Sequence, residues 1–304
     1  MINRRKPVRI GDAVFNTFNF VFMALLAIVT LYPFINTLAI SFNNGVDTLR
    51  GGIYLWPREF SLMNYKAIFI GGNIFHAFYI SVARTLISTL LNIFLTTMLA
   101  FTLSRKEFVF RKPITLIFVL TMYFNAGIIP NYFLIKNLHL LGSFWVYVLP
   151  SMIAAFNMIV IRTFIIGIPE SFVESARIDG AGDFRIFMQV IFPLCKPVLA
   201  TIALFVAVGA WNTWFDTFLY CSSKQNLSTL QYELMKLLSS TQNFNSNPAL
   251  ASGIGANSHS AENLVTSLSI RASITIVAAV PIIIVYPFLQ RYFVVGLNVG
   301  GVKE

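Results

Sequence analysis

Long apolar runs alternate with short polar segments along most of the chain. A helix needs about 20 mostly apolar residues to cross a bilayer. Six runs meet that length, at residues 14–42, 77–103, 113–135, 144–166, 194–220 and 272–294. The pattern therefore predicts an all-α membrane protein with six transmembrane helices.

The composition supports this class. Hydrophobic residues make up 57% of the 304 positions and charged residues only 11%, whereas soluble domains average roughly 45–50% and about 25%. The first run follows the basic stretch INRRKPVRIGD, which resembles the start of a signal peptide. It is much longer than the roughly 7–15 apolar residues of a signal, so we expect a retained first span.

Lysine and arginine are distributed unequally between the two sides of this topology. Fourteen lie on the side that holds both termini and seven on the other side, with Arg84 inside a span counted on neither. Positive residues favour the cytoplasmic side, so we expect both termini in the cytoplasm. The net charge of +10 then reflects topology and not a nucleic-acid partner.

This topology divides the chain into three expected parts. They are a cytoplasmic N-terminus at 1–13, a six-span domain at 14–296 and a cytoplasmic tail at 297–304. The six-span domain includes a cytoplasmic segment at 168–193 and an outer loop at 221–271.

The outer loop contains leucines that share one face of a helix. They are Leu227, Leu230, Leu234, Leu237 and Leu238. This spacing predicts an amphipathic helix, which either packs at the membrane interface or docks an external partner. Residues 239–260 are rich in Ser, Asn and Gly and predict a flexible loop.

Several spans contain residues that are unusual in a membrane helix. Gly127 and Pro130 are expected to loosen the third run. Arg84 and Asp216 are ionisable, which predicts that each faces a polar cavity instead of lipid. Asp216 is near the outer end of its run, so its side chain could also reach the membrane surface.

The segment ESARIDGAGDFRIFMQVIFP, residues 174–193, carries three acids, two arginines and two glycines between two predicted spans. Pro169 and Glu170 are typical of a helix start, and Asp179-Gly180 supplies a turn because glycine accepts a left-handed backbone. A second helix should begin near Asp183. The sequence predicts a helix–turn–helix that projects into the cytoplasm.

The same segment matches the pattern E-A-A, three residues, G, nine residues, I-x-L-P. Glu174, Ala176, Gly180 and Pro193 stand at the required positions, and Ser175, Val190 and Phe192 are mild departures. This signature resembles that of ABC importer permease subunits. The stretches LWPREFSLMNY, AFTLSR, KPVLATIALFVAVGAWNTWFD and QRYFVVGLNVGG are similar to the MalG-type carbohydrate permease family, closest to its LplC/YtcP-like oligosaccharide branch.

The resemblance implies a type I ABC importer permease fold in a bacterial inner membrane, with this chain as half of the channel. In that family the signature segment is a coupling helix that seats on a cytoplasmic ATPase subunit. The positions that carry over are Phe172, Glu174, Ala176, Asp179, Gly180, Ala181, Phe184 and Pro193. Pro193 would set the angle at which the chain returns to the membrane.

The resemblance also implies partners. They are a second homologous permease subunit, two ATPase subunits, and an extracellular or periplasmic sugar-binding protein, besides membrane lipid. The chain has no G-x-x-x-x-G-K-[ST] motif, so we expect a non-catalytic subunit without a cofactor, with ATP and Mg²⁺ bound by the ATPase chains.

A path for sugars should offer aromatic rings with Asn, Gln or Ser nearby. The candidates are Tyr123, Asn125, Trp211, Asn212, Trp214 and Asp216, although anchoring at the membrane boundary explains the tryptophans equally well. Two alternatives stay open. One is a permease for another solute, such as a peptide or amino acid. The other is an ion-coupled carrier, which should show intramembrane carboxylates or an inverted repeat.

Overall fold

The computed structural model describes residues 10–70, 74–245 and 265–301, and these residues are helical apart from loops and one isolated bridge between Asn43 and Phe60. The chain divides into two compact units, which are described separately. One comprises Met1–Gly71 and Leu238–Val277, and the other Gly72–Leu237 and Ala278–Glu304. Parts of the expected N-terminus, outer loop and C-terminal tail lie outside the described residues.

The first unit contains α1 (Ile10–Ser41), α2 (Gly45–Leu49), α3 (Met63–Ile70), the end of α13 (Leu230–Asn245) and the start of α15 (Ser267–Gly301). The buried Asn43 organises the segment that follows α1. Its amide oxygen accepts hydrogen bonds from the backbone N–H groups of Arg58 and Glu59, at 2.8 and 2.9 Å. Burial without such partners would be costly for an amide, so Asn43 holds residues 58–59 against the end of α1.

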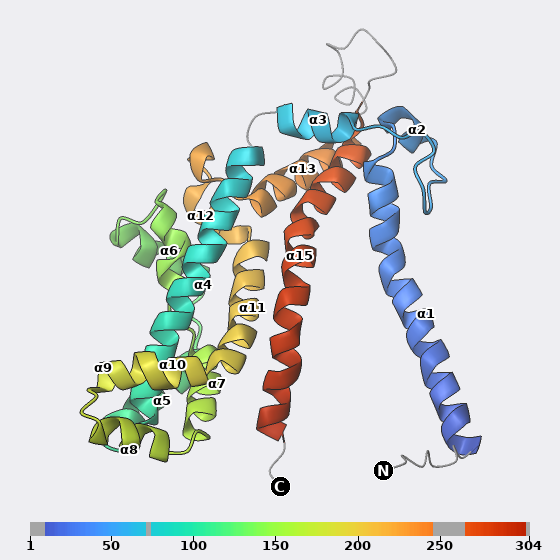
Figure 1. Cartoon of the computed structure of the whole chain (residues 1–304). Coiled ribbons are helices and arrows are strands. Elements are labelled where there is room, and N and C mark those ends of the chain that lie inside the picture. Colours follow the sequence, from blue (N-terminus) through green and yellow to red (C-terminus); the bar gives the residue numbers. More distant parts are fainter. Residues whose placement is uncertain (1–9, 71–73, 246–264, 302–304) are drawn as a thin grey trace. The chain divides into compact units, whose positions relative to one another are not determined.

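The second unit contains the remaining helices (Figure 1). They are α4 (Ile74–Ser104), α5 (Arg111–Tyr123), α6 (Ile128–Asn137), η1 (Phe144–Tyr147), η2 (Leu149–Ser151), α7 (Ala155–Ile166), α8 (Ser171–Ile178), α9 (Asp183–Ile186), the π-helical η3 (Phe187–Ile191), α10 (Phe192–Leu194), α11 (Lys196–Asn212), α12 (Phe215–Cys221) and η4 (Gln225–Leu227). This unit also holds the beginning of α13 and the end of α15.

Helix α4 is the centre of the second unit, because both α7 and α11 pack along it. Its buried face repeats every three or four residues, which is the helical period. The members are Ala77, Ser81, Arg84, Ser88, Asn92, Thr96 and Ala100. Small residues let membrane helices approach closely, and polar residues form hydrogen bonds between helices. These properties allow both α7 and α11 to pack closely along α4.

Three helices in the described residues are long and apolar enough to cross a membrane: Val14–Ser41, Ile74–Ser104 and Ser267–Pro287. They coincide with the first, second and sixth predicted runs. Two bent pairs meet the same criterion if each counts as one span. These are Phe144–Ser151 with Ala155–Ile166, bent by 46°, and Asp183–Leu194 with Lys196–Asn212, bent by 80°.

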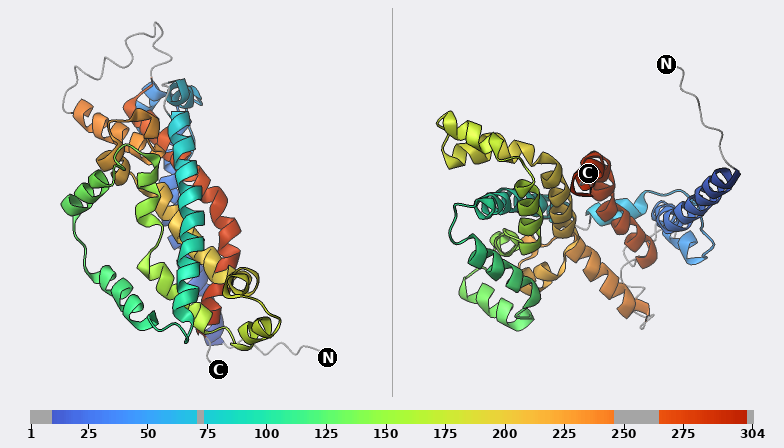
Figure 2. Two further views of the ribbon diagram at one scale, coloured as in Figure 1. Left: turned by 90° about the vertical axis from the view of Figure 1, so that its left-hand side faces the viewer. Right: turned by 90° about the horizontal axis from the view of Figure 1, so that it is seen from below.

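The third run is two short helices instead of one span. Helix α5 ends at Tyr123 and α6 begins at Ile128, and Figure 2 shows an irregular segment between them. Gly127 occupies this break with a φ of +86°, a conformation that glycine adopts without steric cost. Pro130 lies in the first turn of α6, where a backbone N–H has no helical partner. The predicted loosening of this run is confirmed.

The amphipathic helix of the outer loop is present as α13, which begins at the fully buried Leu230. Leu227 lies just before it, in η4. The prediction of a flexible loop from residue 239 is wrong for residues 239–245, which continue α13. Helix continues there because Ser and Asn lower helix propensity only slightly. Residues 246–260 of that predicted loop lie outside the described part.

Phe187, in η3, is the largest fully buried side chain in the hydrophobic core that α8, α9, η3 and α10 share with α4. Its ring lies 5.7 Å from that of Phe101 and 6.0 Å from that of Phe94. We expect Phe187→Ala to lower the free energy of unfolding by about 3–5 kcal/mol, because it removes contacts and leaves a cavity. Phe184→Ala, on the same segment but 65% exposed, is the matched control and should cost far less. Denaturation in detergent micelles measures both, and equal losses would contradict this account of the core.

Candidate functional site

The signature segment, residues 168–193, forms the predicted helix–turn–helix. Helix α8 spans Ser171–Ile178, a turn follows, and helical structure resumes at Asp183 and continues to Leu194 through α9, η3 and α10. Figure 1 shows these helices gathered at the end of α4 that lies next to α5. The two short helices and the turn between them agree with the sequence.

The turn after α8 is a Schellman motif. Gly180 has a φ of +77°, its N–H donates to the Arg177 carbonyl at 3.0 Å, and the Ala181 N–H donates to the Ala176 carbonyl at 2.9 Å. A glycine in this position ends a helix without strain. A side chain on Gly180 would meet nothing within 4 Å, so the glycine is needed for its backbone conformation and not for space. The motif gives a physical reason for Gly180 in the signature, whereas Ala176 and Ala181 contribute only their backbone groups to it.

The signature segment has a packed face and a bare face. Val173, Ile186, Phe187 and Ile191 are buried in the core formed with α4, α7 and α11. The bare face carries exposed apolar side chains: Phe172 at 48% exposure, Phe184 at 65% and Ile178 at 86%. Sequence reasoning missed Ile178, although its place beside the Asp-Gly turn is the signal that could have shown it.

Two acidic residues of the signature accompany the bare face. Glu174 and Asp179 are both exposed, and neither has an ion pair with any residue in the described part of the chain. Exposed apolar side chains beside unpaired carboxylates, in a segment outside the long apolar helices, form a surface that a partner could cover. The bare face is therefore a candidate docking surface.

The chain turns sharply after the signature segment. The 80° bend lies between Leu194 and Lys196, at Cys195. Pro193 precedes this bend and Pro197 follows it. A proline lacks an N–H and crowds the carbonyl four residues earlier, so the two prolines together favour the bend that the sequence had assigned to Pro193.

Ion pairs join the signature segment to the loop between α4 and α5. Arg177 donates two hydrogen bonds to the Glu107 carboxylate, at 2.6 and 2.7 Å, and its Nη2 lies 3.4 Å from Asp183 Oδ1. Lys106 Nζ lies 3.2 Å from Glu170 Oε2. We call these five residues the α8 clamp. The sequence could not reveal it, because Glu107 and Arg177 are 70 residues apart.

The clamp pairs two cations with three carboxylates, and the contact between Arg177 and Glu107 shifts the pKa of both of these residues. The paired hydrogen bonds from Arg177 lower the pKa of Glu107, and those to Glu107 raise the pKa of Arg177. A lowered carboxyl pKa means that the pair is fully formed above the usual glutamate value, about 4.3. It is lost only as the pH falls through the lower pKa of the folded state.

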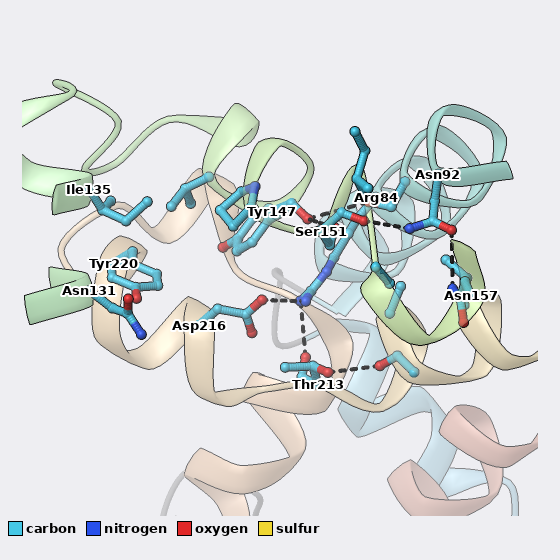
Figure 3. A pocket seen from close by; sticks show the side chains of 18 of the residues that line it. Arg84, Asn92, Asn131, Ile135, Tyr147, Ser151, Asn157, Thr213, Asp216 and Tyr220 are labelled. Carbon is cyan, nitrogen blue, oxygen red and sulfur yellow. Dashed lines mark hydrogen bonds and ion pairs between the residues drawn. The ribbon is translucent and has the colours of Figure 1, made fainter. Parts of the chain in front are cut away.

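A second feature is a polar cavity of about 630 Å³ in the second unit, lined by α4, α6, η1, η2, α7, α11 and α12. Figure 3 shows its amide, hydroxyl and phenol groups. They belong to Ser88, Asn92, Asn131, Tyr147, Ser151, Asn157 and Tyr220. The volume is in the range of small-molecule sites, about 300–1,000 Å³. The described residues contain no group of His, Cys, Asp and Glu that could hold a metal ion.

Arg84 and Asp216 are the charged residues in the cavity lining, and they pair with each other. Arg84 Nη2 donates to Asp216 Oδ2, and Nη1 donates to the Thr213 carbonyl at 3.0 Å. The guanidinium also lies 4.8 Å above the centre of the Tyr147 ring, a favourable cation–π position. The structure places both residues at a polar cavity, as the sequence predicts for each alone.

The other polar side chains of α4 bond to carbonyl groups where neighbouring helices end. Asn92 Nδ2 donates to the Ser151 carbonyl at 2.7 Å, at the end of η2. Ser88 Oγ donates to the Tyr147 carbonyl at 3.3 Å, at the end of η1. Thr213, which bonds Arg84, lies between α11 and α12. The helix breaks around the cavity thus supply hydrogen-bond partners to Arg84, Ser88 and Asn92 of α4.

The remaining candidates for a translocation path lie elsewhere. Trp211 is buried, and its Nε1 donates to the Ala278 carbonyl of α15 at 2.9 Å. Trp214 packs against Phe215 and Phe218. Asn212 is exposed, Tyr123 is exposed at the end of α5, and the Asn125 side chain caps the Gly127 N–H. Of the six candidates only Asp216 is in the cavity lining.

Ser88 and Asn92 also line the cavity, and they are not among the residues predicted from the sequence. Their helical spacing with Arg84 is the signal that could have revealed them.

Long and broken apolar helices around a polar cavity, with an exposed helix–turn–helix at one end, define a multi-pass membrane permease. The chain belongs to the family of binding-protein-dependent transport system inner membrane components, whose model matches residues 67–299. Family and helices together place it in a bacterial inner membrane.

Relatives and a solved structure resemble nearly the whole chain. It is 35% identical to the polygalacturonan/rhamnogalacturonan transport system permease protein YtcP of Bacillus subtilis, over 96% of this chain and 99% of that protein. It is 31% identical to Protein LplC of the same organism, over 95% of both. A crystal structure of a bacterial ABC transporter that imports the acidic polysaccharide alginate matches with a TM-score of 0.83 and 28% identity, over 95% of this chain and 100% of that one.

The Arg84–Asp216 pair gives a test of the cavity. Asp216→Ala leaves the guanidinium, which is only 4% exposed, without its anion, so we expect a loss of about 3–5 kcal/mol in the free energy of unfolding. Arg84→Met should be similarly harmful. The double variant should be more stable than the sum of the two losses predicts, by about 0.5–3 kcal/mol. Additive losses in a detergent denaturation series would show that the two side chains act independently.

Proposed function

We propose that the chain is the transmembrane permease subunit of an ATP-driven carbohydrate importer and forms half of its translocation path. The bare face of the signature segment is the observation that carries this proposal. Its apolar and acidic side chains have no cover in the described part of the chain, and the signature resembles the ATPase-coupling segment of importer permeases. Family membership and the relatives named for sugar transport support the same function.

In the proposed topology six spans place both termini in the cytoplasm. Helices α5 and α6 together make the third span, and the two bent pairs contribute the fourth and fifth. The excess of Lys and Arg on the side of the termini supports this orientation. The parts are then the cytoplasmic N-terminus at 1–13, the permease domain at 14–296 with its outer loop at 221–271, and the tail at 297–304.

The signature segment would seat on one of two cytoplasmic ATPase subunits, which bind ATP and Mg²⁺. Phe172, Ile178 and Phe184 would enter the groove of that subunit, because burying exposed apolar rings favours association. Glu174 and Asp179 would orient the docked helix through charge. A second permease subunit completes the channel, and an extracellular or periplasmic sugar-binding protein delivers the solute.

The polar cavity suits a solute with many hydroxyl groups. Its lining combines apolar side chains with amides, hydroxyls and phenols and with one cation that is already paired with one anion, so it offers both hydrogen bonds and apolar contacts to a sugar. The relatives named for the transport of polygalacturonan, rhamnogalacturonan and alginate support carbohydrate as the solute class, and within it we propose oligosaccharides. The remaining wall of the path would come from the second permease subunit.

The test uses the importer purified as a complete complex and reconstituted in vesicles. We expect Gly180→Val to reduce ATP turnover stimulated by the binding protein and galacturonan oligosaccharides by a factor of about 5–30. A left-handed backbone costs a side chain about 1–2 kcal/mol, which corresponds to that factor. Glu174→Lys should also weaken turnover and uptake, because it reverses a charge on the docking face. Gly182→Ala is the matched control, since Gly182 lies in the same turn with an ordinary φ of −72° and free space for a side chain.

Unchanged turnover and uptake in both Gly180→Val and Glu174→Lys would exclude the docking role. Stimulation by a peptide-binding or amino-acid-binding protein, with none by a sugar-binding protein, would keep the importer and replace the solute class.

A further inference from the structure

The α8 clamp holds α8 at both of its ends. Lys106 reaches Glu170 next to the start of α8, and Glu107 reaches Arg177 in its last turn. Arg177 continues to Asp183, the first residue of α9. Two adjacent residues of one loop therefore contact the two ends of α8, and Arg177 links α8 to the start of α9.

The α8 clamp mainly fixes the orientation of α8 and adds little to the free energy of folding. Exposed ion pairs add little to the free energy of folding, and the apolar side of the signature segment is already fixed by Phe187 and its neighbours. In a bidentate Arg–carboxylate pair, two parallel hydrogen bonds fix the relative orientation of the guanidinium and the carboxylate. The Glu107–Arg177 pair has this geometry. It limits how far α8 can turn relative to the loop.

The loop leads directly into α4. This helix runs without a break from Ile74 to Ser104 and contains neither proline nor glycine. Arg84 is twenty residues from its end, which is about 30 Å along a helix, and it lies in the cavity lining with Ser88 and Asn92. A rotation or shift of the loop end of α4 therefore changes the cavity wall.

We propose that Glu107 and Arg177 are positioning residues that lock α8 to the α4–α5 loop, so that motion imposed on the signature segment reaches the polar cavity through α4. The inference rests on the proposed function, because an ATPase subunit supplies the motion. It adds two residues and a route that the signature does not contain. Both terminal nitrogens of Arg177 are engaged within the chain, which favours a role in holding α8 over direct contact with a partner.

The test follows the cavity wall directly and needs no identified solute. Asn131→Cys places a thiol on the exposed cavity lining, while the native Cys195 and Cys221 are buried. In the purified complete importer, the rate of labelling by a membrane-impermeant maleimide is measured without nucleotide and with ATP and vanadate. Glu107→Gln, Arg177→Gln and the double variant are compared with the intact clamp. Labelling of the same complexes without Asn131→Cys gives the background.

We expect nucleotide to change the labelling rate when the clamp is intact. Each single variant should reduce that change at least about fivefold, the lower end of typical coupling between sites. The double variant should lose no more than the larger single loss, since both substitutions remove one interaction. ATPase subunits should still copurify with all three variants.

Three outcomes would overturn the inference. They are an unchanged nucleotide response in the variants, losses in the two single variants that multiply in the double, and loss of the bound ATPase subunits, which would make both residues part of the docking surface. If nucleotide does not change the labelling rate of the thiol even when the clamp is intact, the result would instead contradict the proposed function.

Discussion

The polar face of α4 is the constraint on which the second unit depends. A bilayer core offers no water, so each buried polar group needs a partner within the protein. Arg84 and Asn92 project from a helix that is otherwise suited to lipid, and a lone charge there would be costly. Their partners are on other elements, Asp216 and Thr213 for Arg84 and Ser151 for Asn92. Helix α4 can therefore be stable only where η2, α12 and the break between α11 and α12 supply those partners.

The same constraint accounts for the broken helices and the cavity together. A break in a membrane helix leaves carbonyl groups without backbone partners, and such breaks persist where the protein satisfies them or where they line a polar space. The breaks at Tyr147, Ser151 and Thr213 each meet a side chain of α4. Amides and carbonyls gathered for this reason also make the surrounding space polar. The cavity follows from the way α4 is paired.

Predictions from the sequence succeeded where a local rule decides the structure. The turn at Asp179-Gly180 follows from the backbone freedom of glycine, and so does the break at Gly127. The break between α11 and α12 contains neither glycine nor proline, so no local rule reveals it. Arg84 and Asp216 each indicate a polar cavity, but the sequence could not show that they pair across 132 residues. The composition also could not show that Trp211 bonds to α15, because helix packing decides which side of α11 faces α15.

The unbroken course of α4 bears on how the signature segment and the cavity can influence each other. Among the elements that line the cavity, α11 and α12 are separated by a break and η2 and α7 by a bend, and each interruption can absorb a displacement. A continuous helix in a close-packed interior transmits displacement instead. Helix α4 joins the core around Phe187 at one end to Arg84 near its middle. Its rigidity, together with the clamp on α8, makes it one stiff connection between the two features in the second unit, beside α7 and α11, which also line the cavity.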